Sequence, residues 1–193
     1  MHYLLFLDVD GVLNSMSFYH SVESITENPV DPEAVKRVAK LIKLTEQLKP
    51  SGNSTEQERG GVPRNTVNVI LTSSWRVGWN KDPKLQDTAG RMLDNTCAMY
   101  GVRLYDKTGV SQIGDRPGEV LEFLRKYPYR VDGFVILDDA NFFWEKYRLS
   151  EWWVQTSFKQ DGFQESMIEP ALSMLANPPW WLKLFNIGKK KHT

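Results

Sequence analysis

The chain has 193 residues, of which 41% are hydrophobic and 25% are charged, so it is long enough for one core and short for two independent domains. Basic and acidic residues number 24 each, which excludes a strong overall field, so nucleic-acid binding would need a local patch. A single cysteine, Cys97, excludes an internal disulfide, and no apolar run approaches the roughly 20 residues that span a bilayer. We expect a reduced, soluble, cytoplasmic protein with no membrane span.

The first predicted element is a strand over Tyr3–Leu7, an apolar run that stops at an acid. A helix is expected to begin at Asp31 and Pro32, an N-cap and first-turn pair, and apolar residues follow at the spacing of one helix face as far as Leu48. The polar interval Ser51–Arg64, rich in Gly, Ser and Asn, predicts a loop.

Strands and helices keep alternating through the rest of the chain. The further predicted elements are a strand over Val67–Leu71, a helix over Ala89–Tyr100 closed by Gly101, a strand over Val102–Tyr105, a helix over Gly118–Tyr127, strands over Gly133–Leu137 and Trp153–Gln155, and a helix over Gln164–Leu175 that Pro170 either kinks or starts. This order predicts a doubly wound α/β fold with a parallel sheet, whose ligands bind beyond the carboxyl ends of the strands.

The C-terminal residues differ in character from the rest. We predict one domain over residues 1–176, followed by a tail over 177–193 that breaks at two prolines and then mixes tryptophans with lysines. Such a tail is compatible with packing on the body, with contact to an anionic partner and with dimerisation. The sequence leaves the role of the tail and the oligomeric state open.

The strongest chemical signal is the heptapeptide 8–14, which contains Asp8, Asp10 and Gly11 directly after the first strand. Both carboxylates emerge at the carboxyl edge of the sheet, close enough to share one cation and one phosphorus atom. One carboxylate can attack phosphorus, while the other protonates the leaving oxygen and later activates water. Gly11 permits a tight turn that brings the backbone near a ligand.

This heptapeptide resembles the first motif of the haloacid dehalogenase (HAD) superfamily, and the other motifs follow in the expected order. The second motif is matched by Thr72, whose hydroxyl would hold a phosphoryl oxygen together with a nearby amide. Ser73 and Arg76, which follow it, are expected to contact the substrate. The resemblance implies a HAD-type sheet with little or no cap domain.

The fourth motif is matched by Asp138 and Asp139, an acid pair that ends an apolar strand. An acid pair in this place needs a cation to neutralise it. With Asp8 and the backbone carbonyl of Asp10, the pair would complete an oxygen-only site suited to Mg²⁺.

The third motif of the superfamily is a basic residue that offsets the crowded negative charge. Arg116 is the first choice, because it opens the helix before the Asp138 strand and that helix start points to the carboxyl edge. Lys107 and Arg130 are the rivals for this role.

Finer similarity concerns the family within the superfamily. Over roughly residues 3–176, the chain is similar to the HAD domains of multidomain RNA repair proteins and to the phosphatase half of polynucleotide kinase-phosphatases. The segments that carry this similarity are 72–76, 116–119, 136–139 and 153–156. The chain departs from those domains at Asp161-Gly162-Phe163, where they tend to show a Gly-Leu-Thr-like turn. The resemblance implies a phosphatase that acts through an aspartyl-phosphate and prefers a nucleic-acid end, a 3′-phosphate first.

The size of the substrate is predicted from the interval Ser15–Thr66, where many HAD enzymes insert a cap. The helix and the polar loop already fill this interval, so the site should be open and suited to a macromolecular phosphate. The cations to test first for contact with a neighbouring nucleotide are Arg76, Lys81 and Arg103. The aromatics Phe142 and Trp144 could stack on a base, but a core or lid role is the favoured interpretation of this segment. The alternatives are a nucleotide or other small-molecule phosphatase and a HAD-fold interaction module without turnover.

Overall fold

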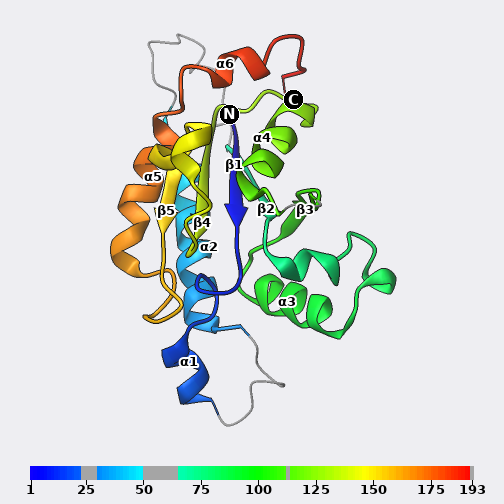
Figure 1. Cartoon of the computed structure of the whole chain (residues 1–193), viewed down its shortest axis with the longest axis vertical. Helices are drawn as coiled ribbons and strands as arrows, with labels where there is room; N and C mark the ends of the chain where they lie inside the picture. Colours follow the sequence, from blue (N-terminus) through cyan, green and yellow to red (C-terminus); the bar gives the residue numbers. More distant parts are fainter. Residues whose placement is uncertain (23–29, 50–64, 112–113, 192–193) are drawn as a thin grey trace, which may run out of the picture.

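The computed structural model describes residues 1–22, 30–49, 65–111 and 114–191. In these residues the chain forms a five-stranded sheet in the order β3-β2-β1-β4-β5, with every neighbouring pair parallel (Figure 1). The strands are β1 (His2–Leu7), β2 (Thr66–Leu71), β3 (Leu104–Lys107), β4 (Gly133–Asp138) and β5 (Trp153–Gln155). The predicted parallel α/β fold is confirmed.

Helices cover both faces of this sheet. They are α1 (Met16–Ser21), α2 (Pro32–Glu46), α3 (Thr88–Met99), α4 (Arg116–Lys126), α5 (Ile168–Ala176) and α6 (Leu182–Phe185). Because neighbouring side chains of a strand point to opposite faces, β1 contributes to two cores. Leu5 and Leu7 pack with residues of α2, α3 and α5, whereas Leu4 and Phe6 pack with residues of α4 and α6. Since β1 and β4 are buried along their whole length, their sequences are continuous apolar runs.

The observed elements differ from the predicted ones mainly at their ends. The third strand begins at Leu104, because the N–H of Val102 bonds to Cys97 O and so still belongs to the end of α3. Helix α4 begins at Arg116 because the side chain of Asp115 caps it. Pro170 lies in the first turn of α5, so it starts this helix and does not kink it.

Helix α1 was not predicted, because none of its six residues is buried and the sequence therefore has no apolar stripe. The loop predicted over 51–64 lies outside the described residues. Between 15 and 66, the described residues form α1, beyond the carboxyl end of β1, and α2, packed on the sheet (Figure 1). They form no large cap domain over that edge. None of the described helices has the length and apolar character that a membrane crossing requires.

The described part of the tail, residues 177–191, packs on the body. Leu182 is 2% exposed, and the ring centroid of Trp181 lies 5.8 Å from that of Phe134. Asn186 exchanges two hydrogen bonds with the backbone of Val131, at 2.9 and 2.8 Å. The tail therefore covers the face of the sheet that carries α4, near the amino end of β4. The division into a domain and a tail after residue 176 remains a prediction.

Candidate active site

The loop after β1 carries the first two acids. Asp8 is 4% exposed, and its N–H donates to Leu137 O at 2.9 Å, so its backbone still belongs to the sheet. Beyond it the chain turns sharply, because the N–H groups of residues 12–14 all point to the carbonyl oxygen of Val9 at 2.8 to 3.2 Å. The turn holds the Asp8 side chain at the carboxyl edge.

Gly11 brings this loop against the end of β4. Its φ of +73° lies in the left-handed region, and a Cβ at this position would lie 2.4 Å from the Cγ of Asp139. Only glycine satisfies both conditions. The carboxylate of Asp139 therefore lies directly against the backbone of the loop that follows β1.

Asp10 is fixed by two side chains. Asn14 Nδ2 donates to one of its carboxylate oxygens at 2.9 Å, and Trp75 Nε1 donates to the other at 3.1 Å. Neither role was predicted from the sequence, although Asn14 closes the heptapeptide 8–14 and Trp75 follows the predicted hydroxyl motif. Both are neutral donors that orient the carboxylate of Asp10 and add no charge.

Arg116 connects the first acid to the end of β4. Its Nη1 lies 2.9 Å from Asp8 Oδ2 and 2.6 Å from Asp138 Oδ2. The ring of Phe142 covers the guanidinium, with 4.4 Å between the guanidinium carbon and the ring centroid. The first turn of α4 thus places a cation among the acids, as the order of the elements predicted.

The two rival cations lie elsewhere. Lys107 Nζ donates to the backbone carbonyls of Arg76 and Trp79, at 2.7 and 2.5 Å. Arg130 pairs with Asp132 just before the amino end of β4. This is the edge of the sheet opposite to the one that carries the acids. Of the three candidates for the third motif, the structure places Arg116 beside Asp8.

Burial and neighbouring negative charge act on the acids at the end of β4. Burial, and then the neighbouring charge of Asp8, raise the pKa of Asp138 to about 7 against the opposing effect of Arg116. The same two causes raise the pKa of Asp139. One guanidinium therefore does not offset the negative charge that folding gathers at this edge.

This group of acids fits a divalent cation. Asp8, Asp138 and Asp139 each offer a carboxylate oxygen, and these atoms lie within 4.8 Å of one another. An oxygen-only donor set matches the preference of Mg²⁺, and a bound cation would relieve the crowding that raises the two pKa values. The Asp10 carboxylate is not part of this group, and a contribution from the backbone carbonyl of Asp10 stays a prediction.

Thr72 presents an unsatisfied hydroxyl beside these acids. It follows β2, and its N–H donates to Leu7 O at 2.9 Å. The residue is fully buried, and its Oγ1 has no hydrogen-bond partner among the described residues. A buried hydroxyl without a partner is costly unless a ligand completes it. Ser73 is also buried, and its Oγ accepts the N–H of Trp75 at 3.4 Å.

Arg76 does not lie where a substrate contact would need it. Its side chain points inward and is 8% exposed. One nitrogen donates to the carbonyl of Thr72, and another lies 2.8 Å from a carboxylate oxygen of Glu119 on α4. Arg76 thus connects the loop after β2 to the helix that begins with Arg116. The predicted contact to a substrate does not agree with this position.

The aromatic segment after β4 contains both a core residue and an exposed ring. Trp144 is fully buried, so it cannot stack on a base, and Phe142 lies on Arg116. The exposed ring is that of Phe143, at 58%, and its φ of +58° is rare for a bulky residue. The side chain of Asn141 accepts the N–H of Phe143 at 2.8 Å and supports this conformation.

Comparison with known proteins gives one family match. Residues 4–168 match the family described as the HAD domain in Swiss Army Knife RNA repair proteins. Neither the search of curated proteins nor the search of solved structures gives a match. The matched range includes most of β1, all of β2 to β5 and every candidate residue of the site.

Proposed function

The chain belongs to the family of HAD domains in Swiss Army Knife RNA repair proteins, and from this we propose that it is a Mg²⁺-dependent phosphohydrolase that removes phosphate from nucleic-acid ends. A 3′-phosphate is the preferred target. The observation that carries the proposal is the convergence of Asp8, Asp139, Arg116 and the unpartnered hydroxyl of Thr72 at one edge of the sheet.

We assign the attack on phosphorus to Asp8. One of its oxygens pairs with Arg116, and the other has no partner among the described residues. The free oxygen forms a bond to phosphorus while the bond to the leaving oxygen breaks, which gives an aspartyl-phosphate. The hydroxyl of Thr72 donates to a phosphoryl oxygen, and Arg116 offsets the charge of Asp8 and Asp138.

Asp10 is the proton carrier in this scheme. It gives a proton to the leaving oxygen in the first step and takes one from the attacking water in the second, which returns Asp8 to its carboxylate form. The hydrogen bonds from Asn14 and Trp75 hold its carboxylate in one orientation. Each oxygen keeps a further lone pair for the proton, because a carboxylate oxygen accepts more than one hydrogen bond.

The cation would be held by Asp8, Asp139 and the backbone carbonyl of Asp10. Asp138 is placed behind these ligands, because its two oxygens already accept from Arg116 and from the N–H of Ala140, at 2.6 and 2.9 Å. A bound Mg²⁺ supplies positive charge that stabilises the transferring phosphoryl group. In this scheme Asp8 is both nucleophile and metal ligand, Asp139 is a second metal ligand, Asp10 carries the proton, and Asp138 pairs with the arginine.

The lack of a cap domain among the described residues supports a large substrate. No described element covers the acids as a cap domain would, and the ring of Phe143 offers a face on which a base can stack, for roughly 1 to 3 kcal/mol. Two of the cations expected to bind the backbone are poorly placed. Arg76 is buried, and Arg103 precedes β3, at the amino edge. Lys81 is 57% exposed and already pairs with Asp106.

The test is a comparison of substrates in the presence of Mg²⁺. Phosphate release is measured from 3′- and 5′-phosphorylated oligonucleotides, mononucleotides and p-nitrophenyl phosphate, with an EDTA control. We expect the highest kcat/KM for the 3′-phosphorylated oligonucleotide and no release in EDTA. Equal kcat/KM for oligonucleotides and mononucleotides would favour a small-molecule phosphatase. No release from any substrate would favour an interaction module without turnover.

A further inference from the structure

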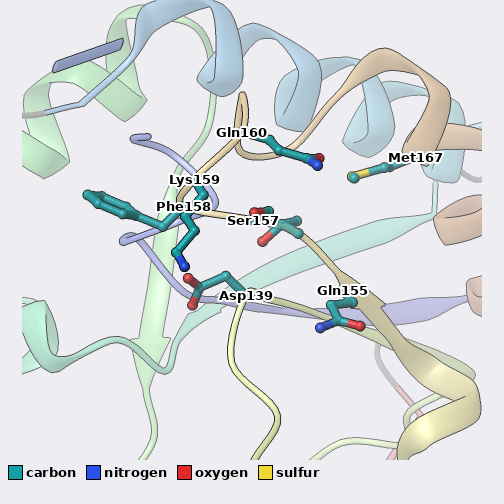
Figure 2. A pocket seen from close by; sticks show the side chains of 8 residues that line it. Asp139, Gln155, Ser157, Phe158, Lys159, Gln160 and Met167 are labelled. Carbon is teal, nitrogen blue, oxygen red and sulfur yellow. The ribbon is translucent and has the colours of Figure 1, made fainter. Parts of the chain in front are cut away.

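A cavity of about 470 Å³ lies at the carboxyl ends of β4 and β5 (Figure 2). It is lined by Asp139, by residues 155–160 and by Met167. Asp139 belongs to the cavity and to the group of acids, since its carboxylate lies within 4.8 Å of those of Asp8 and Asp138. A substrate with its phosphate at Asp8 therefore has this cavity beside it.

The segment that forms one wall of the cavity is held in place by backbone hydrogen bonds. The N–H groups of Gln160 and Gly162 both donate to Ser157 O, at 3.2 and 3.3 Å, which closes a compact turn. The carbonyl of Phe158 accepts the N–H of Met16 at 2.7 Å, and this bond ties the turn to the chain that follows β1. The cavity is thus built on the same loop that positions the nucleophile.

The cavity contains polar groups that lack partners. Thr156 is 3% exposed, and its Oγ1 makes no hydrogen bond to any residue that the structure describes. Lys159 is exposed and has no ion-pair or hydrogen-bond partner in the described ranges, and its side chain extends toward the carboxylate of Asp139 (Figure 2). Gln155 and Gln160 add neutral amides to the lining.

These groups define the chemistry of a ligand. A single ammonium suits one phosphate, and the amides and hydroxyls suit the oxygens of a sugar. An apolar ligand would leave the Thr156 hydroxyl buried without a partner, which is costly. The neutral amides and hydroxyls with one ammonium suit a single nucleotide unit. The carboxylate of Asp139 also lines the cavity, and it belongs to the acids that would hold the cation.

We propose that this cavity binds the nucleotide next to the phosphorylated end, with the ammonium of Lys159 on its phosphodiester and the hydroxyl of Thr156 on one of its oxygens. The inference rests on the proposed function and narrows the substrate to ends of two nucleotides or more. A mononucleotide carries no phosphodiester and gains nothing from Lys159.

The experiment compares Lys159→Gln with Lys183→Gln, a matched change at an exposed lysine on α6, on a helix remote from the cavity. Binding of a fluorescent trinucleotide with a 3′-phosphate is measured by anisotropy in an Asp8→Asn background, which removes the proposed nucleophile. We expect Lys159→Gln to weaken binding about tenfold and to reduce the salt slope by about one. Lys183→Gln should change neither. Thr156→Val, which removes one hydroxyl at nearly constant volume, should weaken binding several-fold.

The catalytic comparison uses the native nucleophile. In Lys159→Gln, the ratio of kcat/KM for a 3′-phosphorylated dinucleotide to that for p-nitrophenyl phosphate should fall about tenfold. An unchanged affinity and ratio, or an equal loss on both substrates, overturns the assignment of the cavity. If the unmodified protein releases phosphate from neither substrate, the proposed function fails. The anisotropy comparison then decides the role of the cavity alone, since an affinity loss upholds it and an unchanged affinity overturns it.

Discussion

Replacing Arg76 with methionine removes the cation from a buried ion pair. The two side chains of the pair, Arg76 and Glu119, are 8% and 3% exposed, with 2.8 Å between the nitrogen and the oxygen. Burial lowers the pKa of Arg76, and the charge of Glu119 opposes this effect. In Arg76→Met, the carboxylate would keep the N–H of Ser111 and lose its charged partner. Because a buried charge is then left uncompensated, we expect the free energy of unfolding to fall by about 3 to 5 kcal/mol.

The double variant Arg76→Met with Glu119→Met is the control. It removes both charges and replaces them with apolar groups, a change that is often neutral in a core. The amide of Ser111 is left without its acceptor, so we expect a remaining loss of about 1 to 2 kcal/mol. Urea unfolding is followed by tryptophan fluorescence and circular dichroism for the double variant and for both single variants, Arg76→Met and Glu119→Met. The m-value checks that the same transition is compared.

Additive losses in the free energy of unfolding would contradict the expected coupling between Arg76 and Glu119. If the double variant is as unstable as the sum of the two single variants, the pair is not coupled and the burial argument is wrong. A loss below about 1 kcal/mol in Arg76→Met would mean that solvent reaches Glu119. A double variant that is as stable as the native chain could still have a higher KM for oligonucleotides. If that increase in KM depends on the salt concentration, Arg76 contacts the substrate.

Three further outcomes are expected. Asp8→Asn should abolish phosphate release while the urea midpoint stays close to that of the native chain, and retained turnover would exclude an aspartyl-phosphate. The raised pKa of Asp138 favours its protonated form in the folded, metal-free protein. Its stabilising contribution is therefore complete below about pH 4 and is lost as the pH rises through about 7. Mg²⁺ should accordingly raise the Tm more at about pH 8 than at about pH 5.5, and equal shifts would contradict this. Gly11→Ala should cost about 1 to 2 kcal/mol from its positive φ and also weaken Mg²⁺ binding in calorimetry, by displacing Asp139. Gly101→Ala, at φ +81° with nothing within 4 Å, should show only the stability loss, so equal Mg²⁺ affinities in the two variants would refute the contact.

The succession of strands along the chain and the position of the acids could be predicted because both depend on local sequence. A strand buried on both faces is a continuous apolar run, so β1 and β4 are recognisable, and the acids that follow them must meet at one edge. Arg116 could be placed there because its helix precedes β4. The location of the acids and of Arg116 at the carboxyl edge of the sheet was thus predictable before any side-chain contact was known.

Side-chain partners could not be predicted in the same way. Arg76 and Glu119 are 43 residues apart, and only the packing of α4 against the loop after β2 brings them together. In the run of aromatics from 142 to 144, composition does not say which ring is buried. In the structure Trp144 is buried, whereas Phe143, whose φ is positive, is exposed.

Both described ends of the chain lie at the edge of the sheet away from the acids (Figure 1). The terminal amino group of Met1 donates to Asn65 Oδ1 at 3.3 Å, just before β2, and the carbonyl of Lys190 accepts the N–H of Arg130, before β4. An attachment at either end, whether a surface, a bead or another folded unit, would hold the molecule at the amino edge of the sheet, opposite the acids. The acidic edge would then face outward, so a long, stiff strand could reach it end-on without passing the point of attachment.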